Sequence, residues 1–404
     1  METGMLNQKE AKQSGKNIRI ESIDLLRGLV MIIMALDHTR DFFHIDAWRD
    51  DPLNLETTTP ALFLTRWITH FCAPVFVFLA GTSAWFQSQI KTKKELSSFL
   101  IKRGLWLILI EVLVINFAFS FDPGFQIIGL QTIWSIGISM ILLGFIIWLP
   151  FKYILAIAIA IIFGHNSLDF YEASHTGTYS LLYSILHHQG FYTIGDKLNI
   201  FIIYPVLPWA GLMIAGYCFG RLFTDYQGKN RNKILIRSGI SAILFFIILR
   251  ASNIYGDPDK WSQQKSLLLS IFNFIDTQKY PPSLLYMSMT IGPAILFLVR
   301  FGSVRNRISQ IITVYGKVPF FYYILHFYLI HALSMIFFLT RGHRLEEGIH
   351  QGNQILPNFI ISGEGYSLEV VYLVWIFVII CLYPLCKWYS EYKKNHKHWW
   401  LGYL

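Results

Sequence analysis

Long apolar runs alternate with shorter polar segments along most of this chain. Most runs approach the roughly 20 residues that cross a bilayer as a helix. The pattern predicts an all-α integral membrane protein with about ten transmembrane helices in one bundle. The run 151–164 is short and follows Pro150, so it is either a full span or half of a broken hairpin. The predicted spans are 22–43, 66–90, 100–120, 128–149, 151–164, 200–220, 235–250, 283–301, 318–340 and 368–389.

The charges between the runs predict the topology. Lys and Arg concentrate in 91–103, 221–237 and 300–317, which ten spans place on the same side as both chain ends. Because cytoplasmic loops are enriched in Lys and Arg, we expect the N- and C-termini to be cytoplasmic. The long outward loops either recognise a sugar or another polar small molecule, or only cover helix ends. These loops are 44–65, 165–199, 251–282 and 341–367.

Composition supports a membrane protein. The chain is 54% hydrophobic and 15% charged, against about 25% charged residues in soluble domains. The lipid bilayer is therefore a predicted partner, and the net charge of +9 does not indicate nucleic acid binding. We expect a polar cytoplasmic tail over 1–19 that is no signal peptide, one multi-pass membrane domain over 20–390, and a basic, aromatic cytoplasmic tail over 391–404. The cysteines lack metal-ligand spacing, so no metal is expected.

Ionisable residues interrupt the first apolar run. Arg27 and His38 are eleven positions apart, which places them within about 20° on one helix face and about 16 Å apart along the axis. Asp24 and Asp41 fall near the same meridian. Because ionisable groups in a bilayer are costly, the default interpretation is that this face has a function.

His38 is the leading catalytic candidate. It lies near the outer end of the helix, beside Asp37 and Asp41, and an imidazole with a carboxylate neighbour can act as a general base at neutral pH. Glu111 interrupts the third run and could orient or charge His38. The alternatives are structural: a buried imidazole bonded to a backbone carbonyl, and a carboxyl group in an ordinary hydrogen bond.

The cytoplasmic end of the same helix is a candidate phosphate site. The Arg27 guanidinium suits bidentate phosphate binding, and Asp24 lies one turn before it. Lys102 and Arg103 begin the third run and could add phosphate contacts. Alternatively, Arg27 reaches lipid headgroups or pairs with Asp24, and the other two residues only anchor the helix.

Further residues are candidates for substrate binding near His38. His70 begins the second run and could face the same outer cavity. His326 and His331 differ by about 140° in helical phase, so at most one is expected beside His38. Tyr322, His326 and Asn116 are candidate donors to an oxyanion, although a packing role is equally open for the tyrosines.

The sequence around the first run resembles a known family. Ser22–Gly28 followed by Ala35–His38 is similar to the first-helix signature of the transmembrane acyltransferase superfamily, in which Arg or Lys precedes His by eleven positions. Further stretches resemble bacterial relatives of heparan-alpha-glucosaminide N-acetyltransferase. These are Trp67–Gly81, Tyr204–Gly220, Tyr280–Pro293 and Tyr315–Ala332.

The resemblance implies an activity. Such enzymes transfer an acyl group, usually acetyl, from cytoplasmic acyl-coenzyme A to an acceptor across the membrane, usually a carbohydrate hydroxyl or amine. It implies acetyl-CoA as the donor, with Arg27 near its phosphates and His38 near the thioester, joined by a pore. It also implies a plasma (inner) membrane location with the active site opening outward.

One departure concerns the mechanism. His70 stands roughly where the lysosomal enzyme has an Asp, and the loop before it offers only His44, so direct transfer with His38 as base is preferred to a covalent acyl-histidine. Two other functions remain alternatives. One is a transporter or flippase of a polar solute, and the other is an assembly protein without a small-molecule site. The sequence does not decide whether the chain forms a homo-oligomer.

Overall fold

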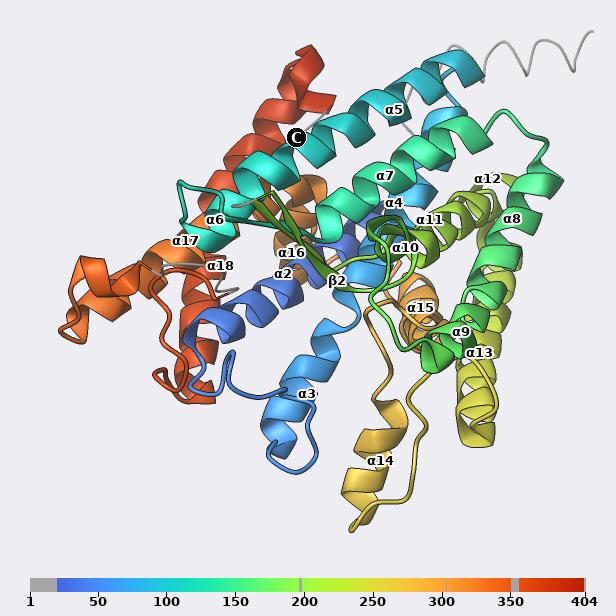
Figure 1. The fold of residues 1–404 in the computed structure, drawn as a ribbon. Helices are drawn as coiled ribbons and strands as arrows, with labels where there is room; N and C mark the ends of the chain where they lie inside the picture. Colours follow the sequence, from blue (N-terminus) through green and yellow to red (C-terminus); the bar gives the residue numbers. More distant parts are fainter. Residues whose placement is uncertain (1–19, 196–197, 303, 350–355, 403–404) are drawn as a thin grey trace, which may run out of the picture.

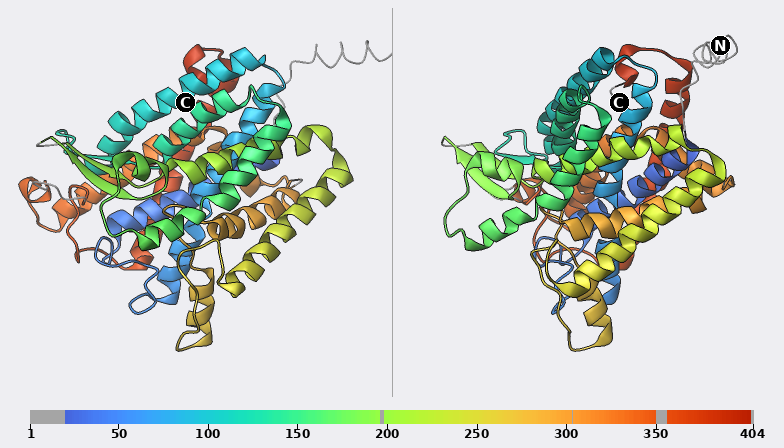
Figure 2. Two further views of the ribbon diagram at one scale, coloured as in Figure 1. Left: turned by 45° about the vertical axis from the view of Figure 1, so that its right-hand side comes forward. Right: turned by 90° about the vertical axis from the view of Figure 1, so that its right-hand side faces the viewer.

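The computed structural model describes residues 20–195, 198–302, 304–349 and 356–402; the predicted tail over 1–19 lies outside these ranges. Long helices form one bundle, and helix α14 (Leu267–Ile275) projects with its flanking loops from one end of it (Figures 1 and 2). The predicted all-α membrane class is confirmed.

The predicted number of ten spans is not confirmed. Within the described residues, six helical segments are long and apolar enough to cross a membrane, and two shorter apolar helices accompany them. The short ones are α7 (Thr132–Ile146) and α15 (Leu284–Arg300). The six segments are Pro60–Ser88, Phe151–Ser174, Val206–Asp225, Gly228–Ser252, Pro319–Thr340 and Leu368–Asn395.

Two of the predicted spans begin as strands. β1 (Ile127–Leu130) and β3 (Leu198–Ile202) pair in parallel, and β2 (Gly190–Ile194) adds antiparallel to β3. Short Ile-rich runs are compatible with either strand or helix, and hydrophobicity alone could not separate them. Each run becomes helical only after the strand, in α7 and in α11 (Val206–Gly220).

The run after Pro150 is a full-length segment. Helix α8 (Phe151–Gly164) continues through a short turn into α9 (Ser167–Ser174), and the two together count as one candidate span. The broken-hairpin alternative is therefore not supported. The second run is interrupted between α3 (Pro60–Thr69) and α4 (Cys72–Ser88).

Helix α2 (Glu21–Phe43) matches the first predicted run and lies inside the bundle. Acidic residues in its first turn and Arg40 in its last complement the helix dipole. It packs most closely against α16 (Arg307–Lys317) through two glycines. A Cβ atom on Gly28 would lie 2.0 Å from the carbonyl oxygen of Ile312, and one on Gly316 would lie 1.8 Å from that of Asp24. Only glycine permits this approach.

The remaining helices complete the bundle. Helix α5 (Lys93–Ile110) starts at a capping box formed by Thr92 and Glu95 and continues through a π-helical turn, η1 (Glu111–Ile115), into α6 (Asn116–Ser120). The other helices are α10 (Leu181–Leu186), α12 (Leu222–Asp225), α13 (Gly228–Ser252), α17 (Pro319–Thr340), η2 (Leu345–Gly348), α18 (Leu368–Asn395) and η3 (Trp399–Gly402).

Candidate functional site at the two ends of helix α2

His38 lies on the wall of a cavity of about 390 Å³ at the C-terminal end of α2. We call it the His38 cavity. Its wall combines charged residues of α2 and α3, polar residues around β1 and residues of the loop before α15. The lining includes Asp37, His38, Arg40, Asp41, Arg66, Asn116, Gln131, Thr132, Tyr204, Lys279, Tyr280, Phe327 and Asn358.

Hydrogen bonds define the tautomer of His38. Its Nδ1 lies 2.7 Å from Nε2 of His326, and Nδ1 of His326 lies 3.1 Å from the carbonyl oxygen of Tyr322. A carbonyl only accepts, so His326 donates from Nδ1 and its Nε2 must accept from His38. In a neutral pair, His38 is therefore protonated on Nδ1 and carries a lone pair on Nε2. The ring of Phe327 stacks on His38 at 4.1 Å and limits its rotation.

The two acidic neighbours of His38 are committed to arginines instead. Asp37 accepts from Arg66 at 2.6 and 2.8 Å and lies 3.0 Å from Arg40. Asp41 accepts from Arg40 as well. No hydrogen bond joins either carboxylate to His38 within the described residues. The structure thus brings both carboxylates into the same cavity, but assigns the orientation of His38 to His326.

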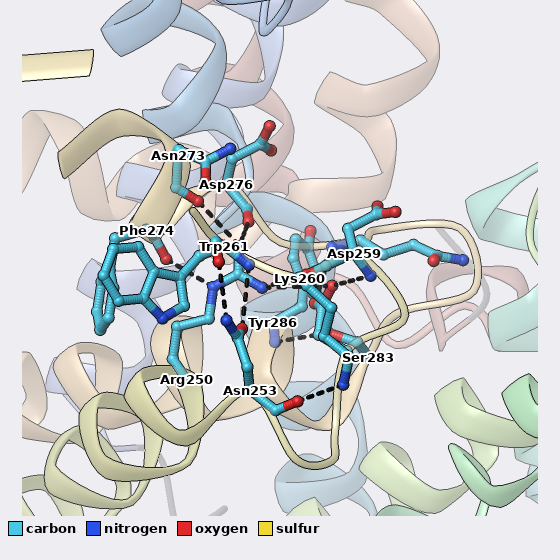
Figure 3. Close-up of polar contacts among 12 residues, drawn as sticks. Arg250, Asn253, Asp259, Lys260, Trp261, Asn273, Phe274, Asp276, Ser283 and Tyr286 are labelled. Carbon is cyan, nitrogen blue, oxygen red and sulfur yellow. Dashed lines mark hydrogen bonds and ion pairs between the residues drawn. The ribbon is translucent and has the colours of Figure 1, made fainter. Parts of the chain in front are cut away.

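Lys279 and Tyr280 reach the His38 cavity from the 253–283 loop. The guanidinium of Arg250, which is 2% exposed, holds this loop (Figure 3). It donates to the carbonyl oxygens of Asp259, Asn273, Phe274 and Asp276 over 2.5–3.0 Å. One side chain therefore fastens both arms of a long loop whose end enters the cavity.

A second anchor of this loop is the carboxylate of Asp257. It lies 3.6 Å from Arg250, and its Oδ2 accepts from the Ser283 hydroxyl at 2.6 Å and the backbone N–H of Gln278 at 3.1 Å. Burial raises the pKa of Asp257 to about 6. Burial, together with Asp51 and Asp257, raises that of Asp276 to about 7.

These pKa values predict that the loop is more stable in mild acid. Both folded pKa values exceed the ordinary value of about 4, so the folded loop binds protons more tightly than the unfolded one. Its stability should fall as pH rises from about 4 to 7. Amide exchange in 253–283, corrected for the intrinsic rate, should be several-fold slower at pH 5.5 than at pH 8. Asp276→Asn should remove part of this difference, and an unchanged difference would contradict the assignment.

Glu111 caps a helix and does not contact His38. It is fully buried in η1, and its Oε2 accepts from the backbone N–H of Trp134, in the first turn of α7, at 3.3 Å. It is absent from the lining of the His38 cavity. Its position favours the structural alternative, because a carboxylate is stabilised at a helix N-terminus.

The three other predicted substrate residues have different positions. Asn116 lines the cavity, but its amide is used in holding β1: Gly129 N–H donates to Oδ1 at 2.6 Å, and Nδ2 donates to Gly129 O at 3.1 Å. His70 and Tyr322 are buried outside the cavity lining. His70 contacts Tyr286, and Tyr322 stacks on His326.

Arg27 lies at the other end of α2. It donates to Gly316 O at 3.1 Å and to the Ser83 hydroxyl at 3.3 Å, and it lies 3.5 Å from Asp24. It lines a polar cavity of about 500 Å³ together with Asp24. We call this the Arg27 cavity. Lys317, Lys393 and Lys394 also line it, so four cations converge there.

The three lysines of the Arg27 cavity were not predictable from sequence spacing, because they come from the ends of α16 and α18, far from Arg27 in the chain. Of the predicted pair, Arg103 lines a smaller apolar cavity of about 190 Å³ next to Arg27, while Lys102 is exposed and lines none of these cavities. Ile20, where the described chain begins, lines the Arg27 cavity together with Lys393 and Lys394 near the end of α18.

The cavities at the two ends of α2 are lined by different residues. The His38 cavity and the small apolar cavity share no lining residue. They approach each other at α7, where Thr132 lines the first and Ile133 the second. A continuous pore between the two ends of α2, which the family resemblance implies, stays a prediction.

Comparison with known proteins agrees with the resemblance noted in the sequence. No curated protein matches this chain significantly. The family model of the heparan-alpha-glucosaminide N-acetyltransferase catalytic region matches residues 19–255. This match includes α2 with Arg27 and His38, as well as α3, β1 and β3, which also line the His38 cavity, but not Lys279, Tyr280 or Phe327. Because it covers more than half of the chain, the protein belongs to the heparan-alpha-glucosaminide N-acetyltransferase catalytic family.

Proposed function

We propose that this protein is a membrane acetyltransferase that moves an acetyl group from cytoplasmic acetyl-CoA to a carbohydrate amine or hydroxyl on the outer side of the plasma membrane. One observation carries the proposal: one helix presents His38, with a lone pair on Nε2, to a polar cavity at one end and Arg27 to a basic cavity at the other. The family match supports the acetyl transfer itself.

The basic cavity suits the phosphates of the donor. Arg27 and the three lysines Lys317, Lys393 and Lys394 offer positive charge around one space, and Arg27 is already oriented by Gly316 and Ser83. Guanidinium and ammonium groups are the usual phosphate partners in proteins. The pantetheine arm would then run towards α7, where side chains near Ile133 must move to admit it.

At the other end, His38 would act on the acceptor. Its Nε2 takes the proton of the acceptor amine or hydroxyl as that group attacks the thioester carbonyl. The tetrahedral intermediate then expels the coenzyme A thiolate, which receives the proton from His38, so protons and charge balance. Nε2 of His326 accepts a hydrogen bond from Nδ1–H of His38 whether His38 is neutral or protonated, so the imidazole keeps its orientation throughout the reaction.

The charged wall of the cavity would position the acceptor. Lys279 is buried and Tyr280 adjoins it, so both are candidates to donate to the oxyanion that develops on the carbonyl. Asp37 and Asp41 lie in the same wall and are held by Arg40 and Arg66. Their fixed oxygens can accept hydrogen bonds from sugar hydroxyls.

The proposal is tested with the purified full chain in liposomes. Labelled acetyl-CoA is supplied on one side and glucosamine on the other, and labelled acetylated sugar is measured. Product that forms only when both are present supports transfer. Flux of glucosamine without consumption of acetyl-CoA would favour a transporter and contradict the proposal.

Replacement of Arg27 should weaken donor binding. Charge-assisted hydrogen bonds contribute about 1.5–3 kcal/mol, so Arg27→Gln should raise the Kd for acetyl-CoA by about 10- to 150-fold in calorimetry. The control is Lys102→Gln, which removes an exposed cation on the same side and should leave Kd unchanged. If Arg27→Gln is folded and binds acetyl-CoA with the same Kd as the wild type, Arg27 does not belong to the donor site.

A further inference from the structure

Chemically active side chains also gather away from the His38 cavity, around the end of the α8–α9 segment and α10. Asp169 and Glu172 are one turn apart on α9, and His187 follows the C-terminal end of α10. None of the three residues lines the His38 cavity, and the proposed transfer does not use them.

The three side chains converge. One ligand atom from each lies within 4.8 Å of the other two. Nδ1 of His187 is 2.9 Å from Oε1 of Glu172, and the imidazole is fully buried. His188 adds a further nitrogen, its Nδ1, at 3.3 Å from Oε2 of Glu172. Two carboxylates and an imidazole at these separations can meet around one cation.

Neighbouring groups orient each of these side chains. Nδ2 of Asn166 donates to Asp169 at 2.7 Å, and the Tyr183 hydroxyl donates to Glu172 at 3.0 Å. Nδ1 of His165 lies 3.1 Å from Nε2 of His187, on the side of the ring away from Glu172. Metal-binding side chains in proteins characteristically have such outer hydrogen bonds, which set the direction of each ligand atom.

We propose that Asp169, Glu172 and His187 bind a divalent transition-metal ion of the zinc type. His187 would bind the metal through Nδ1 as its Nε2–H tautomer, so the proton now on Nδ1 moves to Nε2 and is donated to Nδ1 of His165, whose own proton moves to its Nε2. The imidazole favours zinc and similar ions over magnesium or calcium, which prefer a full set of oxygen ligands. His188 or a water molecule would complete the coordination.

The metal would fasten the segment that leads into the sheet. β2 begins three positions after His187 and pairs along its length with β3. β3 in turn pairs with β1, and Phe201 of β3 and Gly129 of β1 both line the His38 cavity. A metal bridge between α9 and the end of α10 would therefore stabilise one wall of that cavity without touching it.

The test uses the purified full chain in detergent after treatment with EDTA. Calorimetry with Zn²⁺ should show one tight equivalent per chain, and bound Zn²⁺ should raise Tm by several degrees. Elemental analysis after dialysis should find the same stoichiometry. Mg²⁺ and Ca²⁺ should neither compete nor raise Tm.

Two conservative variants separate metal binding from structure. Asp169→Asn and Glu172→Gln retain side-chain size and keep one acceptor oxygen, so both should fold, yet each should weaken Zn²⁺ binding at least tenfold and lose the Zn²⁺-dependent rise in Tm. The matched control is His343→Ala, which removes another imidazole between two carboxylates, Glu347 and Glu364, and should leave binding unchanged. Unchanged affinity in both conservative variants, or absence of stoichiometric binding by the wild type, would overturn the proposal.

Discussion

Replacing His38 with alanine is expected to lower the rate of acetyl transfer by about 10²- to 10⁴-fold, the usual contribution of a positioned general base. The variant loses the lone pair on Nε2 of His38, because the other three ring nitrogens of the His38–His326 pair are used in hydrogen bonds to each other and to Tyr322 O. The Kd for acetyl-CoA should change little, since Arg27 lies at the other end of the helix. Turnover is measured in liposomes, and binding by calorimetry.

A companion variant tests the tautomer. His326→Phe removes the acceptor for Nδ1–H of His38 but keeps an aromatic ring against Tyr322 and Phe327, so the protein should fold while kcat falls and its pH profile shifts. The control is His44→Ala, at the C-terminal cap of α2 and outside the lining of the His38 cavity, with wild-type turnover expected. Wild-type turnover in His38→Ala would exclude His38 as the base.

The second large effect concerns stability. Gly316→Ala should destabilise the protein by more than the roughly 1–3 kcal/mol of ordinary overpacking, because its Cβ would lie 1.8 Å from the carbonyl oxygen of Asp24. Backbone atoms cannot rotate away as a side chain can, so α2 and α16 must separate. Thermal unfolding in detergent should show a large fall in Tm, and acetyl-CoA binding should weaken because Gly316 O also accepts from Arg27.

Gly164→Ala is the matched control. It too places one methyl group on a helical glycine, but nothing lies within 4 Å of the added carbon. Its Tm should stay the same or rise slightly, since alanine favours a helix by up to about 1 kcal/mol over glycine. Equal Tm values for the two variants would show that the helices accommodate the extra carbon at Gly316.

The membrane class and helix α2 could be predicted because both depend on local pattern. Long apolar runs indicate spanning helices wherever they occur, and the eleven-residue spacing of Arg27 and His38 sets their shared face. The structure adds that these residues line cavities at opposite ends of the helix. The strands β1 and β3 could not be separated from helix by hydrophobicity alone, and they replaced the starts of two predicted spans.

The partners of the site residues depend on tertiary contacts and were not predictable. Asp37 is adjacent to His38 in sequence, yet it pairs with Arg66, which comes from α3. His326, predicted as a substrate ligand, is the group that orients His38. Lys317 and Lys393 join Arg27 only because α16 and α18 end beside α2. These contacts join residues that are far apart in the chain, so no short-range sequence pattern predicts them.

The way Arg250 fastens the 253–283 loop has an evolutionary consequence. Its guanidinium donates hydrogen bonds to four main-chain carbonyl oxygens. Every amino acid has this oxygen, so these bonds do not depend on the side chains of the loop. The loop can therefore exchange most of its side chains, including Lys279 and Tyr280, which line the His38 cavity, while its backbone keeps the same path. Homologous proteins could therefore change acceptor specificity through point substitutions in this loop, without changes in the helices that support it.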